Sequence, residues 1–358
     1  MTSRRHTIHW SSIIDSYQPS DGATGLIRST VLLLLSSVIL LCGVVLGQDI
    51  TIRSSSTVVL VPTLVTDSGG KPVYGLHAED FYLEDNGIEQ KVTIDETLES
   101  QPISLVLAIE KSQDASAALE KIQRLGTLID PVIGDGKGEV AVVTFDSESK
   151  LVQDFTPDTS KVDKILKGIK ANGDGPAILD AMRFSAKLLA ARPKNHRKVL
   201  LLISETRDHG SSSSVEDVIR QLEASNTLVY SSTFSPVVDS LWATPTSNTP
   251  NFLNLFKILV QEAKENVPKT LAEVSGGEFL PFKSERSFED KMTEISNHVF
   301  NLYLLSYQPQ NLQPGQHTLR VRLRFNSAAN IYARQGYWAA QESQAQAPQT
   351  AADGVASR

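Results

Sequence analysis

The sequence predicts an α/β fold, in which a doubly wound, mostly parallel sheet is accompanied by a small β-sandwich-like domain. Three observations lead to this prediction. Continuous apolar runs alternate with helical periodicities over residues 101–300, as in sheets whose strands are buried on both faces. Strand patterns precede and follow this region. Neither flank alone has enough strands to bury a core, so we expect the two flanks to pair with each other.

Residues 1–47 are predicted to be a signal peptide or an N-terminal anchor. The apolar run from Val31 to Leu46 spans 16 residues, which is short for a membrane span and typical of a signal-peptide core. Cleavage after Gly47 fits the small-residue rule. A lipid-modified Cys42 is disfavoured because Leu41 before it is large. Each alternative exports the chain, so we expect a periplasmic or extracellular protein, with membrane anchoring through residues 31–46 as the alternative.

Residues 52–100 are predicted to form an N-terminal β segment without a helix. An apolar, β-branched run covers residues 57–66 and ends in a turn cluster at residues 67–70. Asn86-Gly87 is a strong hairpin signal, and residues 90–94 supply the return strand.

Residues 101–300 contain the alternating strands and helices. Strands are predicted at residues 103–109, 140–145, 199–203 and 227–230. Helical periodicity covers residues 118–129, 162–169, 178–189 and 288–299, and a further helix begins at Ser214 with Asp217 in capping-box spacing. The Ser-, Thr- and Pro-rich stretch Ser235–Pro250, which contains Trp242, is predicted to be a surface loop.

Residues 301–340 are predicted to be a C-terminal β segment that packs with residues 52–100. Strands are expected at residues 302–307, 318–325 and 331–337. In the second of these, Arg320, Arg322 and Arg324 alternate with apolar residues, which indicates a half-exposed strand. Its arginine face is either a solvated edge, which we favour, or an anion-binding surface. The Gln-, Ala- and Ser-rich tail, residues 341–358, is predicted to be disordered.

Composition excludes several classes of function. The formal net charge of −7 and the absence of a long Lys/Arg block argue against a nucleic-acid partner. A single cysteine allows neither an intramolecular disulfide nor a cysteine-based zinc site. No two histidines have metal-ligand spacing, no Gly-Lys-Ser/Thr follows the glycine loop at residues 173–175, and no nucleophile-elbow motif occurs. The chain is therefore predicted not to be an enzyme.

Oxygen-bearing side chains follow two of the predicted parallel strands. Glu110, Ser112 and Asp114 follow the first strand at alternate positions, and Glu205 follows the strand at residues 199–203. In an open α/β sheet, ligands bind outside the carboxyl ends of the strands. Carboxylates and a hydroxyl that converge there suit a hard cation such as Mg²⁺ or Ca²⁺.

This layout resembles a von Willebrand factor A domain, a Rossmann-like fold whose metal-ion-dependent adhesion site uses Asp-x-Ser-x-Ser after the first strand. The family adds a Thr from a glycine-rich loop and an Asp after the fourth strand. The flanks resemble the acidobacterial-type von Willebrand factor A-related proteins in two places: residues 76–91, with Glu79-Asp-Phe81 and Asp85-Asn-Gly87, and residues 303–338, which end in Gln335-Gly-Tyr-Trp338. The resemblance covers residues 55–339.

The chain departs from the family's metal motif at four of its five positions. Glu110 and Glu205 replace aspartates, Asp114 replaces a serine and Pro176 replaces the threonine, so that Ser112 alone is kept. The resemblance therefore implies a degenerate adhesion site. We expect no cofactor, with Ca²⁺ favoured over Mg²⁺ if a cation does bind. Without a cation the acids repel, so one of them should take up a proton more readily or turn to solvent. The alternative is that they are ordinary solvated loop acids.

The resemblance implies an exported, non-enzymatic module that binds or scaffolds another protein. We expect the partner to bind at the carboxyl end of the sheet, near Pro176, Asp208 and Trp242. A membrane is expected to be involved only through an uncleaved N-terminal segment. The alternatives are a structural envelope protein and a metal-dependent hydrolase.

Overall fold

The computed structural model describes residues 58–95, 101–122, 124–134, 137–234, 255–310, 313–325 and 328–339. The predicted export segment, the loop Ser235–Pro250 with Trp242, and the tail at 341–358 lie outside the described residues. No helix among the described residues is long and apolar enough to cross a membrane.

The central sheet is mostly parallel. Its strands, in spatial order, are β7 (Ser149–Thr156), β6 (Glu139–Phe145), β5 (Ile103–Glu110), β8 (Arg197–Ser204) and β9 (Thr227–Thr233). β7 alone among these is antiparallel to its neighbour. Parallel bridges to Phe279 and Phe282 continue the sheet beyond β9. All eight residues of β5 are buried, as its continuous apolar pattern predicts.

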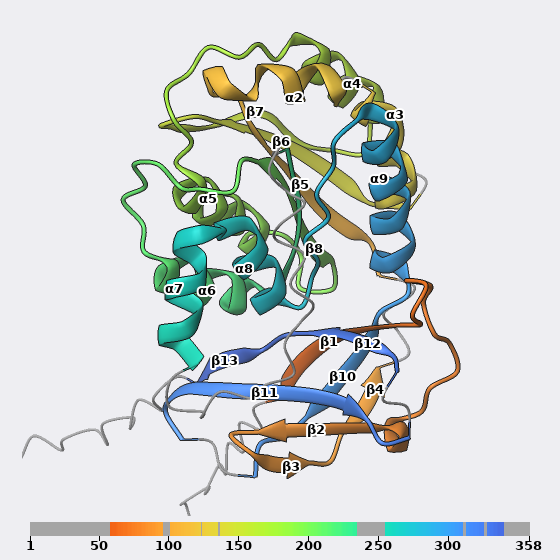
Figure 1. Cartoon of the computed structure of the whole chain (residues 1–358). Helices are drawn as coiled ribbons and strands as arrows, with labels where there is room; N and C mark the ends of the chain where they lie inside the picture. The colour runs from red at the N-terminus through yellow and green to blue at the C-terminus, as the bar shows by residue number, and fades with distance from the viewer. Residues whose placement is uncertain are drawn as a thin grey trace, which may run out of the picture. The chain divides into compact units, whose positions relative to one another are not determined.

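Helices cover both faces of this sheet (Figure 1). One face packs against α3 (Leu125–Ile133), α4 (Thr159–Gly168) and α9 (Glu285–Phe300). The other packs against α5 (Ile178–Ala190), α6 (Val215–Ser225) and α8 (Val267–Ser275). Two further helices are α2 (Ser116–Lys121) and α7 (Leu255–Glu265). Along β5, Leu105 and Leu107 face the first set and Val106 and Ala108 the second, so the two cores share one strand.

The two flanks together form two antiparallel sheets. One has the order β12 (Asn330–Ala333), β1 (Val59–Thr66), β10 (Tyr303–Tyr307), β4 (Thr93–Asp95). The other has the order β13 (Gly336–Ala339), β11 (Gly315–Leu323), β2 (Phe81–Asp85), β3 (Ile88–Gln90). Each sheet contains strands from both ends of the chain, and a shared apolar cluster lies between the sheets. Asn86 and Gly87, both with positive φ, make the β2–β3 hairpin turn.

The predicted fold class is confirmed, and the differences are local. The expected helix at residues 118–129 is two helices, α2 and α3, with a break after Ile122. In the described part of the expected all-β flank, a 3₁₀ turn at Ala78–Asp80 interrupts the strands. We did not predict β7, because it is an edge strand with one fully buried residue, Thr156, and shows no apolar run.

Two of the three arginines on this face, Arg322 in β11 and Arg324 just after it, pair with acidic side chains of the protein. Arg322 lies over the Tyr82 ring and pairs with Glu84, while Arg324 pairs with Glu89. These contacts favour the solvated edge over the anion-binding surface.

Candidate partner-binding face

The predicted site residues lie at the carboxyl ends of β5 and β8. The flanking sheets contact the central sheet at its other end, where Arg334 donates to Asn226 just before β9 at 3.0 Å. Leu60 and Pro62 of β1 line a cavity there with Arg197, the first residue of β8. An eight-residue strand is about 25 Å long, so the described part of the flanks leaves the carboxyl edge uncovered (Figure 1).

Glu110 is directed into the protein. It is 1% exposed. One carboxylate oxygen accepts a hydrogen bond from the Ser112 hydroxyl, and the other accepts from the Glu205 backbone N–H at 2.6 Å. Burial raises the pKa of Glu110 to about 7, although these two hydrogen bonds oppose the rise. The Glu110 carboxylate therefore links the loop after β5 to the loop after β8.

The other two acids differ in exposure. Asp114 lies on a 3₁₀ turn, Gln113–Ala115, and is exposed. Glu205 is half-buried, and its burial, with the charge of Asp114 second, raises the pKa of its carboxyl. The structure thus brings Glu110, Ser112 and Glu205 together and leaves Asp114 at the rim.

The glycine loop is fixed to its neighbours by backbone hydrogen bonds. Gln113 N–H donates to Gly173 O at 3.0 Å, and Ala177 N–H donates to Asp146 O at 2.7 Å. Pro176 is buried, and its carbonyl accepts from His209 N–H at 2.8 Å. Pro176 therefore shapes the loop from within rather than presenting its side chain at the surface.

Two aspartates tie the loop after β8 to the start of α5. Asp208 accepts from Leu179 N–H at 3.0 Å, which satisfies a free donor in the first turn of α5. Asp180 accepts from the N–H groups of Ser212 and Ser213, both at 2.8 Å. Burial would raise the pKa of Asp180, but these donors lower it, so the carboxylate stays charged. Asp180 therefore holds the loop after β8 against the first turn of α5.

The resulting face is held in one arrangement and displays mixed charge. Its exposed side chains include Asp114, Asp174, Arg207 and His209. Ser112 is 1% exposed, so its hydroxyl is out of reach of a substrate even though it donates a hydrogen bond to the Glu110 carboxylate. The arrangement suits the binding of a surface better than a reaction with a nucleophile.

A group that the sequence reading missed lies elsewhere. Among the described residues, the His, Cys, Asp and Glu side chains whose ligand atoms converge are Glu278, Glu294 and His298. The predicted adhesion-site acids do not form such a group. The spacing of Glu294 and His298, four residues apart on one helix face, was the available signal.

Comparison with known proteins identifies the domain. Residues 105–208 match the von Willebrand factor type A domain. A comparison with curated proteins gave no match.

Three solved structures illustrate what the chain is similar to. An aerotolerance-related membrane protein from Bacteroides fragilis is 17% identical, with 55% of this chain and 98% of that one covered and a TM-score of 0.40. A von Willebrand factor type A protein from Catenulispora acidiphila is 12% identical, with 80% and 64% covered and a TM-score of 0.44. Proximal thread matrix protein 1 from the mussel byssus, with a zinc-occupied adhesion motif, is 14% identical, with 60% and 49% covered and a TM-score of 0.41.

The match begins within β5, includes the glycine loop and ends just beyond β8, and these elements form the face described above. The chain therefore carries a von Willebrand factor type A domain.

Proposed function

We propose that the chain is an exported module that binds another protein through the carboxyl edge of its von Willebrand factor A sheet. The observation that carries the proposal is the domain match at residues 105–208, because such domains are in general interaction modules rather than enzymes. The uncovered, mixed-charge face and its hydrogen-bonded loops support it. A rigid surface loses little conformational entropy when a partner binds.

The proposed interaction does not use a metal ion at the adhesion position. A cation there would need oxygen atoms as direct ligands, and Pro176 offers no side-chain oxygen. Both oxygens of Glu110 already accept hydrogen bonds from the protein. Binding therefore depends on direct contacts of the exposed side chains, among them Asp174 and Arg207.

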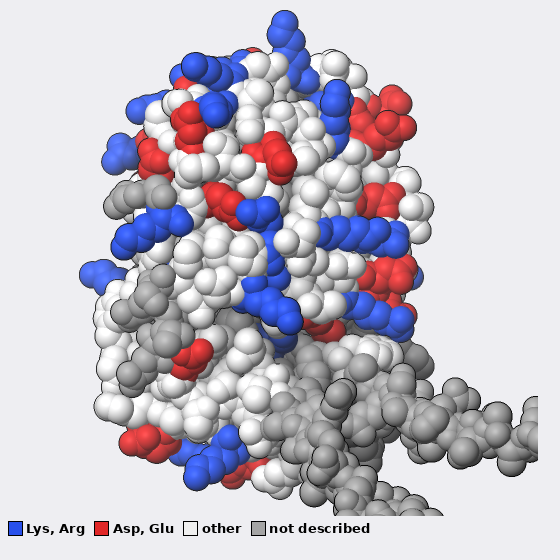
Figure 2. Space-filling model, turned by 180° about the vertical axis from the view of Figure 1, so that it is seen from behind, with Lys and Arg blue, Asp and Glu red and all other residues white. Residues whose placement is uncertain are grey.

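Two alternatives remain distinct proposals. A structural envelope protein would use the domain as a spacer and show no specific partner at this face. A metal-dependent hydrolase would need an activated water or an accessible nucleophile. The burial of Ser112 argues against its use as a nucleophile. On the face of the molecule drawn in Figure 2, Lys and Arg are interspersed with Asp and Glu, which supports a protein partner over a nucleic acid.

Export is tested by N-terminal sequencing of the protein from an envelope fraction. We expect the mature chain to begin near Gln48. A full-length product in the cytoplasm would refute the export proposal.

The binding face is tested by crosslinking and mass spectrometry on the protein in its own envelope. We expect crosslinks to one partner to fall on residues 172–176 and 205–210. Arg207→Glu should then weaken binding of that partner at least tenfold. Lys194→Glu is the matched control, because it makes the same charge change at an exposed residue before the amino end of β8. Crosslinks confined to the flanking sheets, or equal effects of the two variants, would refute the proposal.

A further inference from the structure

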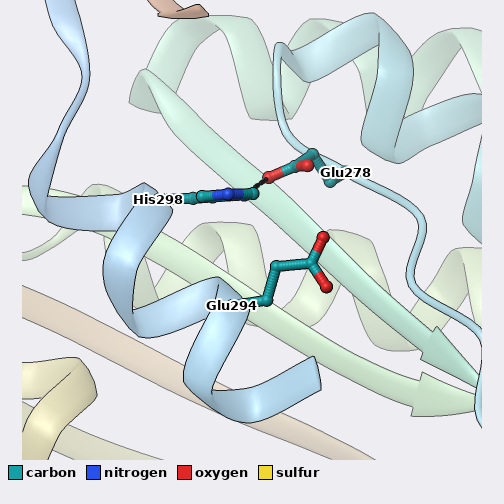
Figure 3. A group of neighbouring side chains, drawn as sticks. All are labelled: Glu278, Glu294 and His298. Carbon is teal, nitrogen blue, oxygen red and sulfur yellow. Dashed lines mark hydrogen bonds and ion pairs between the residues drawn. The ribbon is translucent and has the colours of Figure 1, made fainter. Parts of the chain in front are cut away.

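A histidine and two glutamates converge at one point outside the partner-binding face. Glu278 lies just after α8, and Glu294 and His298 lie on α9. Each offers one ligand atom within 4.8 Å of the others. Figure 3 shows Glu294 and His298 projecting from the same side of α9 towards Glu278. Glu278 is 4% exposed and His298 is 2% exposed, so two of the three side chains are shielded from water.

The ring of His298 is held in an orientation suited to a metal ligand. Its Nε2 lies 3.0 Å from the carbonyl oxygen of Gly70. Because a carbonyl oxygen can only accept a hydrogen bond, Nε2 must carry the hydrogen. Its Nδ1 lies 2.6 Å from a carboxylate oxygen of Glu278. A backbone carbonyl behind the ring is the usual partner that fixes the tautomer of a metal-binding histidine. Nδ1 is thereby directed at the two carboxylates.

The third side chain has a free ligand atom. Lys291 lies 2.6 Å from one carboxylate oxygen of Glu294. Among the described residues, no contact of the other oxygen is recorded. Glu294 is partly exposed, which provides an entry path from solvent.

From this geometry we propose that Glu278, Glu294 and His298 bind one Zn²⁺ ion. Zn²⁺ takes imidazole nitrogen and carboxylate oxygen as ligands, and three protein ligands leave its fourth position to water. Metal–ligand distances of about 2.0–2.2 Å at tetrahedral angles place neighbouring ligand atoms about 3.3 Å apart. The Glu278–His298 pair must therefore open by less than about 1 Å. The ion replaces the proton between Nδ1 and the Glu278 carboxylate, and that proton leaves to solvent.

A buried hydroxyl near the group gives independent support. Tyr230 is 0% exposed, and its hydroxyl has no hydrogen-bond partner in the described part of the chain. Tyr230 precedes Ser231, whose N–H donates to the carbonyl oxygen of Glu278 at 2.9 Å, so Tyr230 and Glu278 lie on paired segments. Buried polar groups are almost always hydrogen-bonded. A water bound to the zinc ion would offer the Tyr230 hydroxyl a hydrogen-bond partner.

The ion would connect three parts of the fold. Glu278 belongs to the segment that pairs with β9, the other ligands belong to α9, and Gly70 belongs to the turn after β1. A bound ion should therefore stabilise the junction between the central sheet and the flanking sheets, because it binds the folded state alone.

Calorimetric titration of tag-free, full-length protein with Zn²⁺ tests the proposal. We expect one saturable site per chain and a higher unfolding temperature in zinc. Glu294→Gln should weaken zinc binding at least tenfold. Glu289→Gln is the matched control: Glu289 lies on the same helix, its side chain is 31% exposed like that of Glu294, and it also pairs with a basic residue. It should bind zinc as the wild type does.

The outcomes separate this site from the adhesion position. Glu110→Ala should leave zinc binding unchanged. The absence of saturable binding, or equal affinity in Glu294→Gln and Glu289→Gln, would overturn the proposal. Loss of binding in Glu110→Ala would also overturn it, because the ion would then lie at the adhesion position. None of these results bears on whether the carboxyl edge binds a protein partner.

Discussion

The side chain of Glu110 connects the loops that follow β5 and β8. Glutamate at position 110 is long enough for its two oxygens to reach the Ser112 hydroxyl and the Glu205 N–H. The pKa of Glu110 is raised, as we expected for one of the acids, but the main cause is burial, and the charges of Glu205 and Asp114 contribute less. The sequence revealed the substitutions, but the closed arrangement depends on side-chain conformations that no spacing predicts.

The titration of Glu110 should make stability depend on pH. Its pKa is about 7 in the folded protein against an ordinary value of 4.5. The folded state binds the proton more tightly than the unfolded state, so this contribution is fully present below pH 4.5 and is lost as pH rises through 7. The loss is on the order of 3 kcal/mol. Urea unfolding at pH 5, 6, 7 and 8 measures it.

Glu110→Gln keeps the shape of the side chain and cannot ionise. We expect its free energy of unfolding to fall less steeply between pH 5 and 8 than that of the wild type. Glu148→Gln, at an exposed position, is the control and should retain the wild-type slope. Identical slopes in all three proteins would mean that Glu110 does not carry this titration.

At the scale of the element, the strands buried on both faces were the ones that the sequence predicted best. β5, β6, β8 and β9 were predictable because both of their faces are covered, which leaves continuous apolar runs. The helix after Ser214 was predictable from its capping box, which the structure contains. α7 and α8, which follow the Ser-, Thr- and Pro-rich stretch in that order, were both missed. Most residues of α8 are buried, so it lacks the one-sided apolar stripe that marks a surface helix. The group formed by Glu278, Glu294 and His298 was missed because Glu278 lies just after α8, which was itself not predicted.

The glycine loop allows a test of how closely the face is packed. A Cβ on Gly173 would lie 2.3 Å from the Cβ of Asp146, whose carboxylate pairs with Lys111. Gly173→Ala should therefore cost about 1–3 kcal/mol of unfolding free energy, because the loop or the Asp146 backbone must move.

Gly168→Ala provides the comparison. No atom lies within 4 Å of a Cβ at Gly168, the last residue of α4, so alanine should be neutral or stabilise the protein by up to about 1 kcal/mol. Chemical denaturation of both variants measures the difference. If Gly173→Ala proved as stable as Gly168→Ala, the loop would be looser than its hydrogen bonds indicate.

At the scale of the whole molecule, the flanks depend on each other. β1 pairs with β10 and β12, β4 pairs with β10, and β2 pairs with β11 and β3. Within the described part of the N-terminal flank, the pairings independent of the C-terminal strands are the β2–β3 hairpin and an isolated bridge between Thr66 and Pro72. A lone hairpin is at best marginally stable.

Deletion of residues 301–340 should therefore unfold the N-terminal flank. We expect amide hydrogens of residues 59–66 and 93–95 to lose protection in hydrogen exchange. Removal of residues 341–358, which keeps every described strand, should leave that protection unchanged. Continued protection of β1 after the larger deletion would contradict the shared-sheet arrangement.

The central claim is that the carboxyl edge binds a protein partner without a metal ion at the adhesion position. The most direct measurement is the affinity of the full-length protein for the partner that crosslinking identifies. It is made with and without EDTA, for the wild type and for Arg207→Glu. We predict that EDTA changes the wild-type affinity less than threefold, whereas Arg207→Glu weakens it at least tenfold. Loss of binding in EDTA that Mg²⁺ or Ca²⁺ restores to the wild type but not to Glu110→Ala would contradict the account.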